Sequence, residues 1–167
     1  MAHTAKENRV LVPLIESTLV SNHAQIQHAA EMIARADAQR IGVLGVTFKR
    51  DTDDLRESPQ VCLIGRLLAT GREVRAFDQN ITPHGIALAY KHAITSATEL
   101  RAGLDALPTI LTESADELLE WADLVVVSHK TTAFVDAVAR HPATALLDLV
   151  NLPATIAANP NYAGICW

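Results

Sequence analysis

Residues 41–59 read IGVLGVTFKRDTDDLRESP, and this stretch is the most informative part of the chain. It opens with an apolar run too short for a helix, passes into a charged loop without glycine, and ends at Ser58-Pro59. A short apolar run flanked by glycines predicts a fully buried strand of a parallel sheet. Serine can cap free backbone N–H groups and proline suits the first helical position, so a helix is expected over residues 61–70, ending at Gly71.

The same alternation of strand and helix continues outward along the chain. Apolar residues at helical spacing over residues 10–38, with an interruption near Ser21 and Asn22, predict a helical N-terminal lead-in. Further strands are expected at residues 40–47, 72–77, 109–111, 124–128 and 144–149, further helices at 95–106, 113–121 and 133–140, and irregular structure at 79–84 and in the Pro- and Asn-rich tail. Strands separated by helical segments of about ten residues predict an α/β fold with a doubly wound, mainly parallel, Rossmann-like sheet.

Composition excludes several classes of protein. The chain has 167 residues, 49% of them hydrophobic, which favours one globular core. A formal net charge of -5 without a basic block argues against a nucleic-acid partner. No apolar run approaches the length of roughly 20 residues that a membrane span needs, and no signal peptide is recognisable, so we expect a cytoplasmic protein without a membrane partner. Cys62 and Cys166 are expected to be reduced thiols.

Three polar segments follow predicted strands, at residues 48–56, 78–80 and 129–130. Ligands of such sheets bind outside the carboxyl ends of the strands, so these segments are expected to converge on one cleft. Lys49 at the strand tip and Arg56 just before a helix start would suit a bound phosphate, although most basic residues in polar loops are simply exposed.

The acidic residues near the two cations leave two interpretations open. Asp53, Asp54 and Glu57 either hold the two cations in place or are ordinary helix-start carboxylates.

Other site chemistries are weakly supported by the sequence. Asp78 stands where a dinucleotide-binding domain places its ribose-binding acid, but the G-x-G-x-x-G fingerprint is absent, which disfavours an autonomous NAD site. The seven histidines show no metal-ligand spacing, so no metal is expected. Cys62 lies in an apolar helical run and is expected in the core, so no nucleophile is assigned.

Three segments together resemble a known family: FKRDTDDLRESP at 48–59, LVPLIESTLVSN at 11–22 and GICW at 164–167. They are similar to the C-terminal, sugar-nucleotide-binding domain of the UDP-glucose/GDP-mannose dehydrogenase family. The resemblance implies a helical linker from a central domain at residues 1–38 and the C-terminal domain at residues 39–167. The GICW ending and LDLVN at 147–151 resemble the GDP-mannose branch, and the chain lacks the D-G-R-N typical of UDP-glucose enzymes. GDP-mannose is therefore favoured as substrate and UDP-glucose comes next.

Family membership would imply NAD-dependent oxidation of the sugar C6 alcohol through a cysteine thioester. The cysteine motif G-G-x-C-L-P-K-D and the NAD-binding domain have no counterpart here, so no catalytic residue is carried over and the fragment alone is expected to be inactive. What the resemblance does imply is that Phe48 and Lys49 line the substrate site and that Arg56 reaches the NAD pyrophosphate. The implied partners are a nucleotide sugar, the missing N-terminal and central domains, and a second copy in a homodimer. The alternative is a stand-alone nucleotide-sugar binding or interaction module without catalysis.

Overall fold

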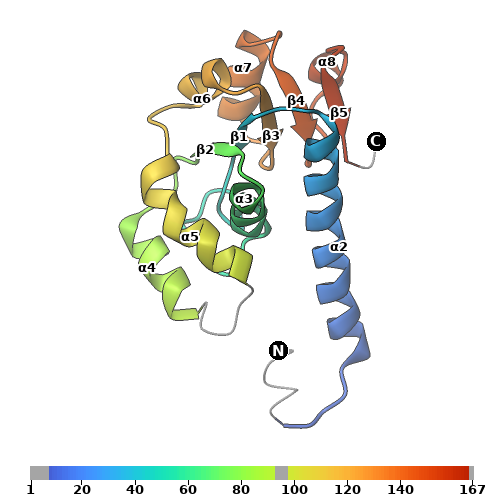
Figure 1. Cartoon of the computed structure of the whole chain (residues 1–167), viewed down its shortest axis with the longest axis vertical. Coiled ribbons are helices and arrows are strands. Elements are labelled where there is room, and N and C mark those ends of the chain that lie inside the picture. Colours follow the sequence, from blue (N-terminus) through green and yellow to red (C-terminus); the bar gives the residue numbers. More distant parts are fainter. Residues whose placement is uncertain (1–7, 93–97, 166–167) are drawn as a thin grey trace.

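A five-stranded, all-parallel sheet forms the centre of the molecule (Figure 1). The computed structural model describes residues 8–92 and 98–165, and Cys166 lies outside this part of the chain. The strand order is β2-β1-β3-β4-β5. The strands are β1 (Arg40–Leu44), β2 (Glu73–Phe77), β3 (Leu124–Val127), β4 (Ala145–Asp148) and β5 (Tyr162–Gly164). The predicted doubly wound, parallel architecture is confirmed.

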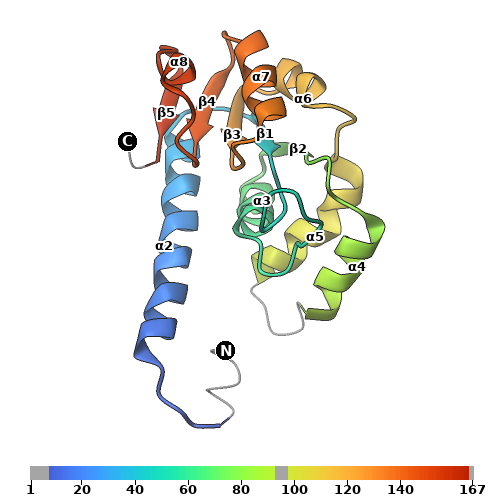
Figure 2. The same cartoon turned by 180° about the vertical axis from the view of Figure 1, so that it is seen from behind.

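Helices cover both faces of this sheet (Figures 1 and 2). One face carries α2 (Pro13–Arg35), α3 (Pro59–Ala69), α4 (Pro83–His92) and α5 (Thr98–Ile110), and the other carries α6 (Ala115–Trp121), α7 (Thr132–Arg140) and α8 (Ala154–Ala157). Each face therefore has its own hydrophobic core.

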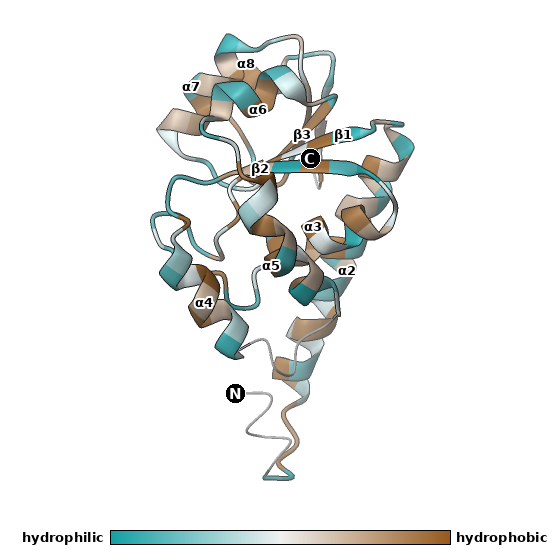
Figure 3. Cartoon of the chain, turned by 60° about the vertical axis from the view of Figure 1, so that its left-hand side comes forward, coloured by the Kyte–Doolittle hydropathy of each residue, from teal (hydrophilic) through white to brown (hydrophobic). Residues whose placement is uncertain are grey.

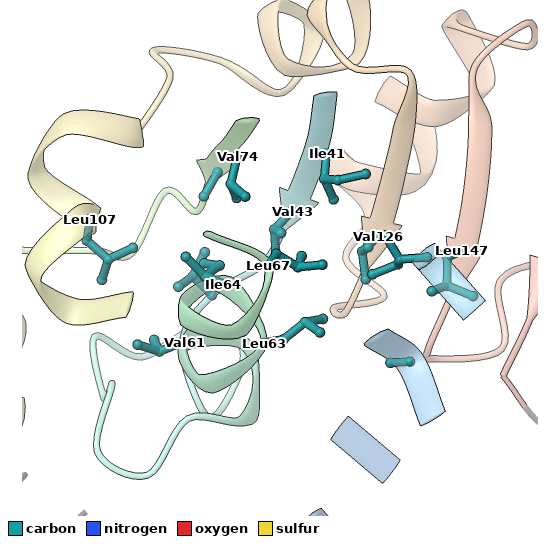
Figure 4. Close-up of a cluster of buried hydrophobic side chains, with 14 of the residues drawn as sticks. Ile41, Val43, Val61, Leu63, Ile64, Leu67, Val74, Leu107, Val126 and Leu147 are labelled. Atoms are coloured by element: carbon teal, nitrogen blue, oxygen red, sulfur yellow. The ribbon is translucent and has the colours of Figure 1, made fainter. Parts of the chain in front are cut away.

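The alternation of side chains along β3 shows how the two cores are separated. Val126 packs into the core on the side of α3, whereas Val125 and Val127 pack into the core on the side of α7. All four residues of β3 are buried, as expected for a central parallel strand with helices on both faces. Figure 4 shows Ile64 and Leu67 of α3 facing the sheet.

Local signals in the sequence set the ends of α3. The Val61 N–H donates to the Ser58 hydroxyl over 3.3 Å, and Pro59 occupies the first turn. The helix ends at Ala69, and Gly71 takes a φ of 80°, which favours glycine.

Two expectations for local structure were wrong. The predicted break near Ser21 and Asn22 is absent, because α2 runs unbroken from Pro13 to Arg35; weak helix formers cost only a few tenths of a kcal/mol and do not stop a helix. The predicted strand at 109–111 is also absent. Residues up to Ile110 belong to α5, and Leu111 makes only an isolated parallel bridge to Ala76.

Three elements were not predicted: α4, α8 and β5. The signal for α4 lay in Thr82-Pro83, because the Thr82 hydroxyl accepts a hydrogen bond from the Gly85 N–H over 3.0 Å and proline begins the helix. The other two have only four and three residues, too few to show a periodicity.

The N-terminal half of α2 projects from the body of the molecule (Figures 1 and 3). Leu14 is 81% exposed and Val20 is 70% exposed, whereas Ala29 and Ile33 further along the helix are buried. Among the described residues, no helix combines the length and the apolar character needed to cross a bilayer.

Candidate functional site

The buried polar residues of the described chain gather at one edge of the sheet. They are Thr47, Ser58, Asp78, Ser128, His129 and Asp148. Thr47, Asp78, Ser128 and His129 come within three residues after β1, β2 or β3, Asp148 is the last residue of β4, and Ser58 caps α3. A buried polar side chain is more informative than an exposed one, since burial must be compensated by hydrogen bonds. The carboxyl edge of the sheet is therefore the candidate site.

The strand order locates a crevice at this edge. The connection from β1 to β2 runs through α3 on one face, whereas the connection from β3 to β4 runs through α7 on the other. In open α/β sheets with this order, ligands bind where the direction of winding changes, between the tips of β1 and β3. Thr47 and His129 meet at this position, because His129 Nε2 lies 3.0 Å from the Thr47 carbonyl oxygen.

Asp78, directly after β2, binds the backbone of Val46 and Thr47, the residues that follow β1 and are called the β1 tip. Its Oδ2 accepts the Val46 N–H over 2.8 Å and the Thr47 N–H over 3.0 Å, and its Oδ1 accepts the Asn80 N–H over 3.0 Å. Burial raises the pKa of Asp78, but these hydrogen bonds outweigh it, and the pKa lies below its usual value. The two amides that could face a pyrophosphate at this turn bind a carboxylate of the chain instead. The turn therefore does not fit an autonomous NAD site, and Asp78 is not placed as a ribose acid.

His129 and Gly45 bring the β1 and β3 tips into direct contact. A Cβ on Gly45, whose φ is 89°, would lie 2.7 Å from the His129 ring and 2.8 Å from the Ser128 hydroxyl. Ser128 donates to the Gly45 carbonyl over 2.5 Å. Glycine is thus required at residue 45 both for its φ and for the close approach of the ring.

The loop after β1 presents the two residues that the sequence assigns to the substrate. Phe48 is 47% exposed, and its N–H donates to the Asp54 carbonyl over 2.6 Å. Lys49 is exposed, and its carbonyl accepts the Thr52 hydroxyl over 2.8 Å. The loop backbone is thus held by internal hydrogen bonds while both side chains remain accessible at the candidate site.

Asp54 orients Arg56, so of the two interpretations of this carboxylate the structure supports the one in which it holds a cation in place. Arg56 Nε and Nη2 donate to the two Asp54 oxygens over 2.8 and 2.7 Å, a paired geometry. This contact with Arg56, assisted by the charge of Lys49, lowers the pKa of Asp54 to about 2. Asp54 therefore interacts electrostatically with both predicted cations, Arg56 and Lys49. The Arg56 nitrogens that bind Asp54 are Nε and Nη2, so Nη1 is turned away from this carboxylate.

Helix α4 supports the same loop from outside the sheet, which the sequence analysis missed. The Thr82 hydroxyl donates to the Asp53 carboxylate over 3.0 Å. A Cβ on Gly85 would lie 2.4 Å from the Asp53 carbonyl oxygen, so α4 contacts the loop backbone directly. Asp53 therefore joins the loop to the start of α4.

The third predicted segment also reaches this edge. Arg50 Nη1 donates to the Lys130 carbonyl over 3.4 Å, and Lys130 Nζ donates to the Asn151 carbonyl over 2.7 Å. Asp148 accepts the Val150 N–H over 2.7 Å and so holds the turn after β4. These contacts confirm that residues 48–56, 78–80 and 129–130 meet at this edge, and the shared cleft stays a prediction. The missed residues at this edge follow apolar strands directly, and that position was the signal that could have found them.

Metal and thiol chemistry find no support within residues 8–92 and 98–165. No group of three or more potential ligands is close enough to hold a metal ion there. Cys62 is half-buried, and burial, helped by the charge of Glu57, raises the pKa of its thiol to about 11. A thiol with this pKa is protonated at neutral pH and is a poor nucleophile.

Comparison with known proteins agrees with the geometry. Residues 42–152 match the family model described as the UDP binding domain of the UDP-glucose/GDP-mannose dehydrogenase family. The chain is 34% identical to GDP-mannose 6-dehydrogenase of Pseudomonas aeruginosa over 169 residues, which covers 100% of this chain and 37% of that protein. It is 26% identical to a UDP-glucose 6-dehydrogenase of Bacillus subtilis, covering 84% of this chain and 28% of that protein.

Solved structures show the same relationship. A ternary complex of GDP-mannose dehydrogenase from Pseudomonas aeruginosa superposes with a TM-score of 0.74 at 33% identity, over 99% of this chain and 37% of that one. A UDP-glucose dehydrogenase from Pyrobaculum islandicum, at 19% identity and a TM-score of 0.66 over 99% of this chain and 35% of that one, shares the fold. The chain thus spans between 28% and 37% of the length of these relatives. It belongs to the UDP-glucose/GDP-mannose dehydrogenase family and carries the C-terminal, UDP-binding domain of that family.

Proposed function

We propose that this chain is the nucleotide-sugar-binding part of an NAD-dependent sugar-nucleotide 6-dehydrogenase, with GDP-mannose favoured over UDP-glucose. The single observation that supports the proposal is that the loop after β1, in a domain of this family, presents the exposed side chains of Phe48 and Lys49 and an Arg56 paired with Asp54. The preference for GDP-mannose is supported by coverage, because the match to a GDP-mannose enzyme covers 100% of this chain, whereas matches to two UDP-glucose enzymes cover 84% and 54% of it.

The chemical roles follow from the types of side chain at the loop. Phe48 offers an exposed ring for apolar contact with the nucleotide sugar, and Lys49 offers a point charge for its phosphates. Arg56, with Asp54 holding one side of its guanidinium, would direct Nη1 toward the pyrophosphate of NAD bound by another domain. NAD would accept hydride from the sugar C6 atom when bound, while the residues of this chain hold the substrate.

The chain divides into two parts under this proposal. Residues 1–38 are a helical linker from a central domain, and residues 39–167 are the substrate-binding domain. The exposed Leu14 and Val20 on the projecting half of α2 support this division, because such apolar residues gain free energy when a further domain or a second copy covers them. Turnover would require the NAD-binding and cysteine-bearing parts of the relatives that this chain does not span, so the chain alone is expected to bind without oxidising.

Calorimetric titration of the chain with GDP-mannose, UDP-glucose and NAD tests the proposal. GDP-mannose should bind most tightly and NAD alone should not bind. Lys49→Ala should weaken nucleotide-sugar binding about tenfold or more, since hydrogen bonds to charged groups contribute about 1.5–3 kcal/mol. Lys91→Ala, at an exposed lysine near the end of α4, is the matched control. Equal affinity of the Lys49→Ala and Lys91→Ala variants would contradict the site, and oxidation of either sugar nucleotide by this chain would contradict the assignment of catalysis elsewhere.

A further inference from the structure

The backbone of Val46 and Thr47 is held entirely by side chains from other elements. The last paired residue of β1 is Leu44, opposite Phe77 and Val127, and the Gly45 N–H makes the final backbone contact to β2, at the Phe77 carbonyl. Beyond this point the chain leaves the sheet, so the direction of the following loop is not set by strand pairing.

Three side chains replace the sheet as partners of these two residues. Asp78 accepts both N–H groups, over 2.8 and 3.0 Å. The Val46 carbonyl accepts the Ser58 hydroxyl over 2.6 Å, and the Thr47 carbonyl contacts His129 Nε2 at 3.0 Å. Every backbone donor and acceptor of residues 46 and 47 therefore has a buried side-chain partner.

The chemistry of the carbonyl determines the tautomer of His129. A carbonyl oxygen can only accept, so Nε2 must carry a hydrogen and donate it. Nδ1 then faces Asp78, whose Oδ2 lies 3.8 Å away. His129 is 7% exposed and rests against Gly45, where no side chain would leave room for the ring. The ring is thus held against Gly45, Thr47 and Asp78, which follow β1 and β2, with Nε2 directed at the Thr47 carbonyl.

We propose that His129 and Asp78 are positioning residues of the nucleotide-sugar site, which fix the backbone of residues 46–47 and so the direction of Phe48 and Lys49. The proposal rests on the proposed function. Neither residue needs to touch the ligand, because Phe48 and Lys49 follow the clamped segment directly and inherit its orientation. Pre-organisation of this kind raises affinity by reducing the ordering that binding requires.

His129→Leu and His129→Gln form the test pair. Leucine removes the donor, whereas the glutamine amide can donate to the Thr47 carbonyl. In amide hydrogen exchange by NMR, His129→Leu should speed exchange at residues 46–48 about tenfold, which corresponds to about 1.4 kcal/mol, while amides of residues 42–44 change little, because the variant loses a buried hydrogen bond. His129→Gln should restore much of the protection. Unchanged exchange at residues 46–48 would show that His129 does not hold the backbone of residues 46 and 47.

The second measurement is the affinity for GDP-mannose, or for UDP-glucose if that ligand binds more tightly. His129→Leu should weaken this affinity about tenfold and His129→Gln by no more than about threefold, corresponding to about 1.4 and 0.7 kcal/mol. If His129 acts through Lys49, its substitution by leucine should cost much less in a Lys49→Ala background. Asp78→Asn, which keeps one acceptor oxygen, should behave like His129→Leu.

The outcomes separate the two claims. Failure of the unsubstituted chain to bind either nucleotide sugar would overturn the proposed function. The hydrogen-exchange experiment would still decide whether His129 holds the backbone of residues 46 and 47. Normal binding by the unsubstituted chain together with unchanged binding by His129→Leu would overturn the positioning role alone. Purely additive losses in the Lys49→Ala background would do the same.

Discussion

Helices α3 and α5 cross so closely that a single methyl group should separate them. A Cβ on Gly65 would lie 2.0 Å from the Glu99 carbonyl oxygen, and a Cβ on Gly103 would lie 2.1 Å from the Val61 carbonyl oxygen. Both obstacles are backbone atoms, which cannot rotate away as a side chain can. Gly65→Ala is therefore expected to push the two helices apart.

The magnitude of this effect is set by two opposing contributions. Overpacking a core costs about 1–3 kcal/mol, and the backbone obstacle places Gly65→Ala at the upper end of that range. Replacing a mid-helix glycine by alanine returns about 0.5–1 kcal/mol. The net loss in the free energy of unfolding should therefore be about 2 kcal/mol.

Urea unfolding followed by far-ultraviolet circular dichroism measures this loss, with Gly71→Ala as the matched control. Gly71 has a φ of 80°, and no atom outside Gly71 and its two chain neighbours lies within 4 Å of the position that an added methyl group would take, so only backbone strain of about 1 kcal/mol opposes alanine there. If Gly65→Ala proved no more destabilising than Gly71→Ala, the inferred backbone contact between α3 and α5 would be refuted.

Arg56→Ala should raise the pKa of Asp54 from about 2 toward its ordinary 3.8, as measured by carbon-13 NMR of the carboxylate. Because the folded pKa is the lower one, the contact stabilises the loop above about pH 4 and is lost as the pH falls toward 2; an unchanged Asp54 titration in the variant would argue against the pair. Cys62 should react with iodoacetamide at pH 8 far more slowly in the folded chain than in urea, as followed by peptide mass spectrometry, since its thiol pKa is about 11; equal rates would show that the thiol is not shielded. Gly85→Ala should shift the amide resonances of the loop after β1, because its methyl would lie 2.4 Å from the Asp53 carbonyl oxygen, and an unperturbed loop would exclude direct support by α4.

Much of the site was predictable because its segments follow apolar strands directly. Residues 48–56, 78–80 and 129–130 were each recognisable as polar stretches at strand ends, and parallel strands bring such ends to one edge. The position of Arg56 just before the helix start was also predictable, because the Ser58 cap is a local sequence signal. The roles of Phe48, Lys49 and Arg56 in binding remain predictions.

The partners of these residues were not predictable, because hydrogen bonds between distant segments leave no periodic signal. Asp78 had the sequence position of a ribose acid, yet it lies where two amides of the β1 tip converge on it. Asp53 and Asp54 are adjacent and chemically identical, but one contacts Thr82 and the other Arg56. Helix α4, which begins directly after Thr82, was hidden because Pro83 and Gly85 obscure its apolar pattern.

Local patterns in the sequence are enough to predict the alternation of buried strands and capped helices, the family, and the loop that carries Phe48, Lys49 and Arg56. These features depend on local patterns: apolar runs, a serine and proline at a helix start, and an irregular motif at fixed spacing. That Asp78, Ser58 and His129 hold the backbone of residues 46 and 47 follows only from the folded structure. The backbone leaves the sheet at Gly45 with unpaired polar groups, and only folding brings side chains from three other segments close enough to bind them.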